Sequence, residues 1–346
     1  MIALVARAPT RIDFGGGWTD VPPYAAEEGG FVCNVAITRY ATARLAVRTP
    51  TDPVAAPDGE HQLADTALRV AALPHVRARQ HNDFPVGAGL GGSSAAGVAM
   101  MGAVEAWRAL SARPNYAVEA VVRPEASPLL AIPRDRAALA EASRRVEVEE
   151  LHIAGGRQDH YAAAFGGALA LRFGATTDVR QLPLSRRTVR TLESRCVVVY
   201  TGQSRISGDT IRAVIDSYSN RASHVLAALA RMKMLAEAMA DAVLAGDIDA
   251  LGMLVGEHWI HQRALHPAIS TPLIDRIIAV ATAAGAIGGK ALGASGGGCV
   301  LLIAANGFEE PVRRAVEALA APLPFAIDLR GFSWWPAHDP HAPPES

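Results

Sequence analysis

Hydrophobic residues recur with a helical period over a long stretch in the second half of this 346-residue chain. Between Ser223 and Leu244 they are spaced mostly three and four residues apart, which predicts an amphipathic helix that Gly246 ends. A second helix is predicted over Ile248–Leu265, and the Thr271-Pro272 pair indicates the start of a third, which ends near Gly285. The pattern then predicts a strand, a helix and a strand, at Val300–Ala304, Pro311–Ala320 and Phe325–Phe332.

The first half has a different pattern, in which short β-prone runs alternate with turns. Two helices interrupt it. One is predicted over Gly97–Leu110, directly after a cluster of glycine and serine, and the other over Asp135–His152, with Asp135 as its cap. Thr49–Gly59 is expected to be a loop. The strands predicted before the long helix are Leu4–Ala6, Phe31–Ile37, Ala41–Val47, Ala168–Phe173 and Cys196–Tyr200.

This order of elements predicts an α+β chain in two halves, divided between residues 170 and 200. A length of 346 residues is sufficient for two domains that pack against each other. We place an N-terminal domain at residues 1–185 and a C-terminal domain at residues 186–335. The polar, proline-rich segment 336–346 is expected to be disordered.

Composition narrows the choice of partner. Half of the residues are hydrophobic and the formal net charge is -1, so no overall field would attract nucleic acid or acidic lipid. No hydrophobic run approaches the roughly 18 residues of a membrane-spanning helix, and the N-terminus lacks a signal-peptide pattern. We therefore expect a cytoplasmic protein with a small-molecule partner, no nucleic-acid or membrane partner, and a monomeric or homodimeric state.

The number and spacing of the cysteines are typical of a protein in a reducing compartment. Cys33, Cys196 and Cys299 lie far apart in the sequence, each in an apolar, strand-like run. They form no CxxC pair and no even-numbered disulfide framework. We predict that all three are buried free thiols.

The strongest chemical signal is a glycine-rich run, Pro85–Ala96, that leads directly into a predicted helix. Its four glycines let the backbone curl and present successive N–H groups, and the helix N-terminus adds a partial positive charge. Two hydroxyls, of Ser93 and Ser94, stand where they could reach a phosphate oxygen or Mg²⁺. The run predicts a polyphosphate-binding loop that is not a Walker A loop, because no GK[ST] ends it. A glycine-rich capped loop without a ligand is the alternative.

Three more segments carry candidate chemistry. Arg11–Asp20 contains three glycines between charged and aromatic residues, and its two ends could also form a simple salt bridge. Gly293–Gly298 is a run of small residues that lets a ligand or another backbone approach, or that forms a tight turn. Asp159 follows the Gly155-Gly156 pair, where its carboxylate could accept a proton from a substrate hydroxyl or cap the next helix.

At these segments the sequence resembles the GHMP kinases, the family of galactokinase, homoserine kinase, mevalonate kinase and phosphomevalonate kinase. The first family motif matches Arg7–Asp20, the central P-x-x-x-G-L-G-S-S-A-A motif matches Pro85–Ala96, and the third, glycine-rich motif matches Gly293–Gly298. The motifs stand in the family's order, and the resemblance extends to about residue 332. It implies a two-domain GHMP kinase fold, with an N-terminal domain similar to ribosomal protein S5 domain 2 and a C-terminal ferredoxin-like α/β sandwich.

The resemblance also implies that the chain binds ATP and Mg²⁺. Mg²⁺ would be held by Ser94, which we favour over Ser93, and by Glu149, which stands ten residues before Asp159. Glu147 and Glu150 would point elsewhere on the helix, about 100° per residue away. The residues assigned to ATP are Pro85, Gly87, Gly89, Leu90, Gly91, Gly92, Ser93, Ser94 and Ala95. Those assigned to the acceptor are Gly17, Trp18, Thr19, Asp20, Arg205, Gly296 and Gly297.

Two further residues are assigned to catalysis by the resemblance. Asp159 would accept or orient the proton of the attacking hydroxyl, and Arg11 would stabilise developing charge near the γ-phosphate. This small set is chemically sufficient, because phosphoryl transfer depends mainly on positioning and charge neutralisation.

Within the family the nearest resemblances are to heptose 7-phosphate kinases and to fucokinase-like sugar kinases. Gly156–Asp159, and Trp259 with Arg263, resemble the heptose kinases, whereas Asp13 and Trp18 resemble the fucokinase-like domain. The leading hypothesis is a kinase that phosphorylates the anomeric hydroxyl of a heptose 7-phosphate-like sugar, giving a 1-phosphate for nucleotide-sugar biosynthesis. The alternatives are a fucokinase-like or other hexose 1-kinase and, in a different class, a non-catalytic sensor of ATP and sugar.

The sequence departs from the family pattern at two glycine-rich positions. The central loop has one glycine more than the commonest pattern, at Gly91-Gly92. Ser295 stands where the family often has glycine. Serine is small enough to be tolerated at this position provided that its φ is negative, because side chains are disfavoured at positive φ.

Overall fold

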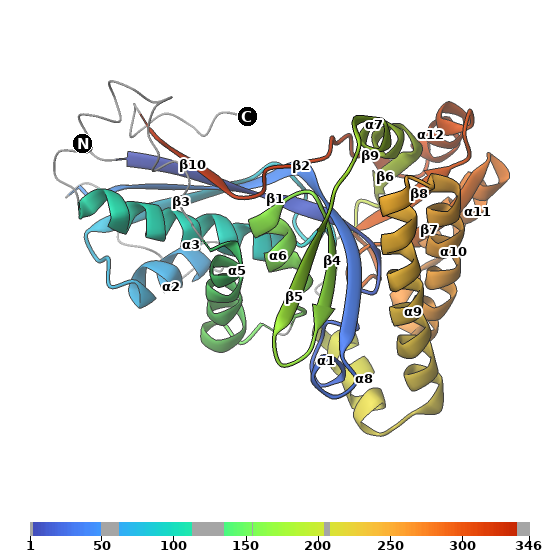
Figure 1. Cartoon of the computed structure of the whole chain (residues 1–346), viewed down its shortest axis with the longest axis horizontal. Coiled ribbons are helices and arrows are strands. Elements are labelled where there is room, and N and C mark those ends of the chain that lie inside the picture. Colours follow the sequence, from blue (N-terminus) through green and yellow to red (C-terminus); the bar gives the residue numbers. More distant parts are fainter. Residues whose placement is uncertain (1–2, 50–61, 113–134, 154, 204–207, 338–346) are drawn as a thin grey trace.

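The computed structural model describes residues 3–49, 62–112, 135–153, 155–203 and 208–337. Within these residues two antiparallel sheets lie side by side, each with helices packed against it (Figure 1). The first is a 6-stranded sheet in the order β10-β1-β2-β4-β5, with β3 also paired to β2. The second is a 4-stranded sheet in the order β7-β8-β6-β9.

The strands of the first sheet are β1 (Ala3–Gly15), β2 (Gly30–Val47), β3 (Val76–Asn82), β4 (Ala168–Phe173), β5 (Thr177–Leu182) and β10 (Ser333–Pro336). Those of the second are β6 (Cys196–Tyr200), β7 (Ala286–Ala291), β8 (Cys299–Ala304) and β9 (Ala321–Pro322). The α-helices before residue 200 are α1 (Tyr24–Glu27), α2 (Gln62–Val70), α3 (Gly92–Ser111), α5 (Arg136–Arg145), α6 (Gln158–Phe165) and α7 (Arg186–Arg195). Those after it are α8 (Gly208–Ser219), α9 (Ser223–Ala245), α10 (Ile248–Ala264), α11 (Pro272–Ala283) and α12 (Glu309–Glu317). A π-helical turn spans Val146–Glu150, and a 3₁₀ turn spans Pro267–Ile269.

Strand β2 is the central strand of the first sheet and pairs with three other strands. It is 18 residues long and pairs with β1 over most of its length, with β4 along its first part and with β3 along its last part. Nearly all of β1 and most of β2 are buried, so these strands have core on both faces rather than the alternation of a half-exposed strand.

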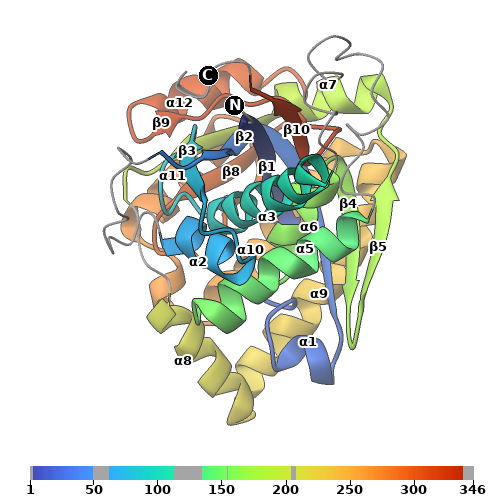
Figure 2. The same ribbon diagram turned by 90° about the vertical axis from the view of Figure 1, so that its left-hand side faces the viewer.

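Helices cover the first sheet from two sides. Helices α3 and α6 pack against β1 and β2, and α5 packs against both helices, as Figure 2 shows from the side where α3 lies in front. Helix α9 contacts β1, β2 and β4, and α10 lies between α9 and strand β7 (Figure 1). The α9–α10 hairpin therefore joins the two sheets.

The glycine-rich segments meet where the two sheets adjoin. The Cys299 amide donates to the Ala88 carbonyl over 2.8 Å, and the Arg11 amide donates to the Leu90 carbonyl over 3.1 Å. The central loop thus touches β8 of the second sheet on one side and β1 of the first sheet on the other. Segments nearly 290 residues apart in the sequence are brought to a single place.

Most of the predicted elements are confirmed. Strands β4 and β6 have the predicted bounds, and the helices of the second half begin and end within a few residues of the prediction. Their signals act as expected: Thr271 Oγ1 accepts from the Ile274 amide, and Gly246 ends α9 in the left-handed conformation. Asp135 likewise caps α5 through the Ala138 amide.

Some predicted boundaries are wrong. The two runs Phe31–Ile37 and Ala41–Val47 form the single strand β2, because β1 pairs across the junction through a register shift at Pro9/Thr10. The last strand is not Phe325–Phe332 but Ser333–Pro336, and it pairs with β1 in the first sheet rather than with the second sheet. The predicted loop Thr49–Gly59 and the tail after Ala337 lie almost wholly outside the described residues.

Three further predictions concern the cysteines, membrane-spanning helices and the domain limit. All three cysteines are buried and free, as predicted. None of the described helices has both the length and the apolar character needed to cross a bilayer. The predicted domain limit at residue 185 falls between β5 and α7.

Candidate active site

A cavity of about 960 Å³ opens where the glycine-rich segments meet. Its size is that of a pocket for a nucleotide-sized ligand. Residues of all four predicted segments line it, together with the polar side chains of β3. The chain therefore folds these separate segments into one site.

The start of α3 forms one wall of the cavity. Gly91 precedes the helix in the left-handed conformation, with φ 73°, and no side chain caps the helix. The first N–H groups of α3 are therefore available to an anion, and the helix dipole favours negative charge at this end. This geometry could hold a polyphosphate, the role that the sequence analysis expected for Pro85–Ala96, and it stays a prediction.

Asp159 lies directly against this helix start. A Cβ placed on Gly91 would come within 2.7 Å of its Cγ, so only glycine allows the carboxylate this close to the backbone. Arg11 holds the carboxylate, because its Nε and one terminal nitrogen each lie 2.7 Å from Oδ1 of Asp159. Its other terminal nitrogen donates to the Gly89 carbonyl over 2.7 Å. One guanidinium thus joins the acidic residue to the glycine loop.

The environment of Asp159 acts on its proton affinity in two directions. Burial raises the pKa of the carboxyl, and the adjacent Arg11 lowers it, with the net result above the ordinary value. A carboxylate with a raised pKa accepts a proton more readily than one in water. The arrangement suits a group that takes a proton from a hydroxyl.

Glu147, Ser94 and His160 form a second acidic centre beside the helix start. Ser94 Oγ donates to Oε2 of Glu147 over 2.9 Å, and His160 Nε2 lies 2.9 Å from the same oxygen. On its other side, His160 Nδ1 is 2.9 Å from the Ser143 hydroxyl. Burial acts to raise the pKa of Glu147, but the His160 and serine hydrogen bonds outweigh it and hold the pKa below the ordinary value.

The prediction that Glu149 faces Ser94 is wrong. Glu149 is exposed and lies 3.7 Å from Arg144, whereas Glu147, expected on a solvated face, is buried against Ser94. The cause is local, because α5 passes into a π-helical turn at Val146. In a π turn the backbone hydrogen bonds join residues five apart instead of four. Each later side chain is therefore rotated away from the position it would have in an α-helix.

Asp20 is a further acidic residue of the cavity. Its side chain is buried and accepts a hydrogen bond from the Gln158 amide over 3.0 Å, which links it to the start of α6. Burial raises its pKa to about 6, and the nearby carboxylates of Asp159 and Asp13 contribute to the increase. Gly17, Trp18 and Asp20, which are predicted to bind the acceptor, all line the cavity.

Other predicted acceptor residues have different outcomes. The hydroxyl of Thr19 does not line the cavity; it lies 2.7 Å from the Gly16 carbonyl and accepts the Phe31 amide over 3.0 Å, so it stabilises the turn. Gly297 lines the cavity, whereas Gly296 donates its amide to the Ile269 carbonyl. Arg205 lies outside the described residues.

Two non-glycine residues of the cavity have left-handed backbones. Ser295 has φ 69°, so the condition of a negative φ is not met, and Trp18 has φ 81°. Such conformations cost free energy and persist where the surrounding structure fixes them. At Ser295 the surrounding contact is Gln262, whose Nε2 donates to the serine hydroxyl over 3.2 Å.

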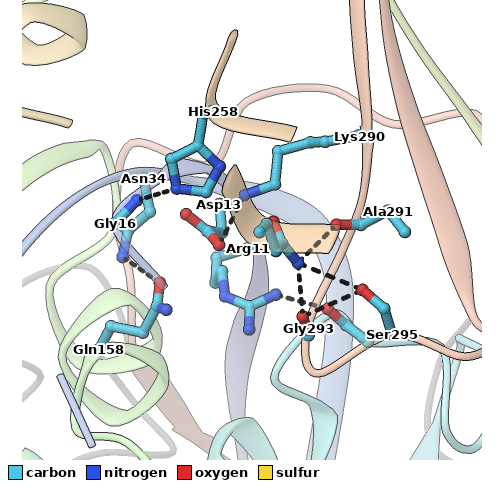
Figure 3. A network of polar contacts seen from close by, with 12 residues as sticks. Arg11, Asp13, Gly16, Asn34, Gln158, His258, Lys290, Ala291, Gly293 and Ser295 are labelled. Carbon is cyan, nitrogen blue, oxygen red and sulfur yellow. Dashed lines mark hydrogen bonds and ion pairs between the residues drawn. The ribbon is translucent and has the colours of Figure 1, made fainter. Parts of the chain in front are cut away.

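A polar network that no sequence pattern predicted lies beside the cavity (Figure 3). Lys290 of β7 donates to Oδ2 of Asp13 over 3.0 Å, and His258 of α10 accepts the Gly16 amide over 2.8 Å. Burial lowers the pKa of His258 well below its ordinary value, so the ring is neutral. Lys290 gave no recognisable signal, because it stands in an otherwise small and apolar segment.

Comparisons with known proteins agree with this geometry. The N-terminal domain model of the GHMP kinases matches residues 61–167, and the C-terminal model matches residues 239–323. The D-glycero-alpha-D-manno-heptose 7-phosphate kinase of Campylobacter jejuni is 24% identical over 339 residues, covering 91% of each chain. The crystal structure of a D-glycero-D-manno-heptose 1-phosphate kinase from Bacteroides thetaiotaomicron superposes with a TM-score of 0.71 at 24% identity, covering 97% of this chain and 100% of that one.

A third relative is larger than this chain. The bifunctional fucokinase/GDP-fucose pyrophosphorylase of Arabidopsis thaliana is 24% identical over 368 residues, which cover 94% of this chain but 32% of that protein. The chain therefore spans about a third of that relative's length. The two domain models together match more than half of this chain, in the order that the family requires.

The chain belongs to the GHMP kinase family and has the two-domain, mixed helix and sheet fold of that family. It is an ATP-dependent phosphotransferase related to sugar kinases. The resemblance read from the three motifs is thus confirmed at the level of family, fold and reaction class.

Proposed function

We propose that this chain is a sugar kinase that transfers the γ-phosphoryl group of ATP to an anomeric hydroxyl and gives a sugar 1-phosphate. The supporting observation is the position of Asp159, held by Arg11 against the uncapped start of α3. A hydroxyl bound between Asp20 and Asp159 would face a γ-phosphate bound at that helix start. The proposal places the reaction in the cytoplasm, where ATP is available.

The proposed step uses the chain's own residues in three roles. The acceptor hydroxyl oxygen bonds to the γ-phosphorus as the bond from that phosphorus to the ADP oxygen breaks, and the hydroxyl proton passes to Asp159. Arg11 fixes the carboxylate and places positive charge beside the transferring group. The α3 amides and the Pro85–Ala95 loop hold the remaining phosphates.

Mg²⁺ fits the donors at the start of α3. Ser94 and Glu147 offer two oxygen ligands, and the described residues hold no cluster of three or more His, Cys, Asp or Glu that would suit a fully protein-ligated metal. This matches Mg²⁺, which commonly takes one or two protein ligands and completes its shell with phosphates and water. When bound, the ion would neutralise charge on the β- and γ-phosphates.

Two acceptors remain candidates, a heptose 7-phosphate-like sugar and an unphosphorylated hexose such as fucose. The first is supported by the heptose kinase relatives and by the Gly156–Asp159 string. The second is favoured by the charge of the cavity: among its described lining residues, Arg11 is bound to Asp159, His160 is bound to Glu147, and only His81, on β3, adds another basic side chain. Three carboxylates that also line the cavity, Asp13, Asp20 and Asp159, lie near enough to one another to interact electrostatically.

The test is turnover of ATP with a panel of heptose 7-phosphates and unphosphorylated hexoses, followed by ³¹P NMR of the product. We expect one class to give an anomeric phosphate. Asp159→Asn should lower kcat at least about 10³-fold, because the proton acceptor is lost, while the Kd for ATP stays within about threefold. Asp178→Asn, at an exposed position of β5, is the matched control and should leave kcat unchanged. Binding of ATP and sugar without turnover by the wild type would instead support the sensor.

A further inference from the structure

The side chain of Asp13 is buried beside the reacting centre, and the proposed mechanism does not use it. Asp13 and Arg11 are two residues apart on β1, so both project from the same face of the strand. Both line the cavity. Asp13 therefore lies next to the guanidinium that holds Asp159.

Only one oxygen of this carboxylate is satisfied. Lys290 Nζ donates to Oδ2 over 3.0 Å, and the side chains of Asp13 and Lys290 are 3% and 0% exposed. Oδ1 is buried and has no hydrogen-bond partner among the described residues. Because a buried acceptor without a donor is unfavourable, this oxygen can gain a hydrogen bond from a molecule that enters the site.

The surroundings of Asp13 leave few donors within the chain itself. Gly17 passes over the carboxylate so closely that a Cβ there would lie 2.5 Å from Oδ2. Asn34, directly opposite on β2, directs its amide nitrogen to Gln158 Oε1 over 3.4 Å, away from Asp13 (Figure 3). The donor that Oδ1 lacks is therefore to be sought in the ligand.

From this geometry we infer that Oδ1 of Asp13 accepts a hydrogen bond from a hydroxyl of the acceptor sugar, and that Lys290 is the positioning residue that holds Asp13 for this contact. The inference rests on the proposed sugar kinase function and specifies the acceptor further. An alcohol can donate at this position, whereas a fully ionised phosphate or a carboxylate cannot donate and would be repelled by Asp13 and by Asp20 beyond pH 6. The part of the sugar that meets this wall therefore carries a neutral hydroxyl.

Lys290 fixes the orientation of the Asp13 carboxylate through their ion pair. It enters from β7 of the second sheet, while Asp13 belongs to the first sheet, so the ion pair crosses between the two. Burial lowers the pKa of Lys290, and the Asp13 carboxylate opposes that decrease. With Oδ2 fixed by the ammonium, Oδ1 has one orientation left.

The test combines enzyme variants with monodeoxy analogues of whichever sugar the wild type phosphorylates. Asp13→Ala with Lys290→Met removes both charges together, so that no unpaired charge is left buried. In the wild type, one deoxy analogue should lose at least about 10²-fold in kcat/KM, because the site has a buried acceptor that it leaves unpaired. In the double variant the decrease in kcat/KM for that analogue should be about threefold or less. The decreases in kcat/KM for the other deoxy analogues should stay as in the wild type.

A purely structural ion pair predicts a different result. The double variant would then lower kcat/KM for the parent sugar and for every deoxy analogue by the same factor, and this result would overturn the inference. The matched control is Arg195→Met with Asp249→Ala, which removes an ion pair outside the cavity. It should leave the whole pattern of deoxy losses as in the wild type.

A second variant covers the case in which the double variant fails to fold. Lys290→Gln keeps the Asp13 carboxylate and a hydrogen-bond donor beside it. We expect KM for the sugar to rise at least about tenfold with kcat within about threefold and with the same deoxy analogue still singled out. An unchanged KM would contradict the positioning role of Lys290.

Failure of this inference can be separated from failure of the proposed function. If the wild type phosphorylates no sugar, the proposed function falls and the role of Asp13 falls with it. If the wild type phosphorylates a sugar and the deoxy pattern is the same with and without Asp13, only the role of Asp13 is wrong.

Discussion

Asp20 is an acid whose burial opposes its ionisation. Its pKa rises from an ordinary value of 3.8 to about 6, mainly because of burial. The folded protein therefore binds a proton at Asp20 more tightly than the unfolded chain does. It follows that the stability of the ligand-free protein falls as the pH rises from about 4 to about 6.

Replacement of Asp20 by Asn should remove this pH dependence. Compared with the wild type, Asp20→Asn should gain stability progressively from pH 4 to pH 7, by about 3 kcal/mol in all, the free energy that corresponds to the pKa difference. Urea denaturation at a series of pH values measures it. A constant difference between the two proteins across this range would show that Asp20 does not titrate as described. The same variant should bind the acceptor sugar more weakly.

Ser295 allows the strain of a left-handed residue to be measured. Ser295→Gly and Ser295→Ala both remove the hydroxyl that meets Gln262, but only glycine relaxes the backbone at φ 69°. We expect the Gly variant to be more stable than the Ala variant by about 1 kcal/mol. Thermal denaturation of the two variants side by side tests this, and equal stabilities would contradict it.

At the scale of single elements, the π-helical turn after α5 decides which glutamate meets Ser94. Glu147→Gln should lower kcat by at least about 10²-fold and raise the Mg²⁺ concentration needed for half-maximal activity, because an anionic oxygen is lost at the start of α3. Glu149→Gln, two residues along, is the matched control and should change either quantity by less than about twofold. Equal effects of the two substitutions would show that the turn does not set the register in solution.

The same turn shows how far the sequence could predict the site. The glycine-rich loops, Arg11 and Asp159 could be identified because backbone curvature and phosphate chemistry restrict the residue types at each position. Glu149 was chosen over Glu147 by its ten-residue offset before Asp159, and an offset in sequence does not reveal that the chain forms a π turn there. The Asp13–Lys290 pair was missed for a different reason: it joins residues 277 positions apart, and no local pattern encodes it.

The fold was predictable to a similar degree. Helices with caps, such as α9 and α11, were located from their periods and their terminal residues. Strands with mixed polar residues, such as β3 and β5, were missed because neither has the apolar run that marks a strand. Their place depends on β2 and β4, with which they pair, rather than on their own composition.

At the scale of the whole molecule, polar contacts join the two sheets across the site. Lys290 binds Asp13, His258 binds the Gly16 amide, and Cys299 binds the Ala88 carbonyl. Helix α9 also packs on the first sheet while α10 packs on the second. Because these contacts are buried, neither sheet can unfold without exposing the other.

We therefore expect a single cooperative unfolding transition. Differential scanning calorimetry should give a ratio of calorimetric to van't Hoff enthalpy near 1, and fluorescence and far-UV circular dichroism should give coincident curves. Saturating MgATP should raise Tm without splitting the transition, because the nucleotide binds the folded state alone. Two separate transitions would mean that the sheets unfold independently.

The pairing of β10 with β1 has a consequence for the order in which the protein can assemble during synthesis. Residues 333–336 leave the ribosome long after residues 3–15, yet the two segments are neighbours in one sheet. Until then the outer edge of β1 has no strand beside it, and exposed strand edges can pair with other chains. Nascent chains that stall before β10 emerges should therefore be the ones that need chaperones, although every residue assigned here to phosphoryl transfer has already been made.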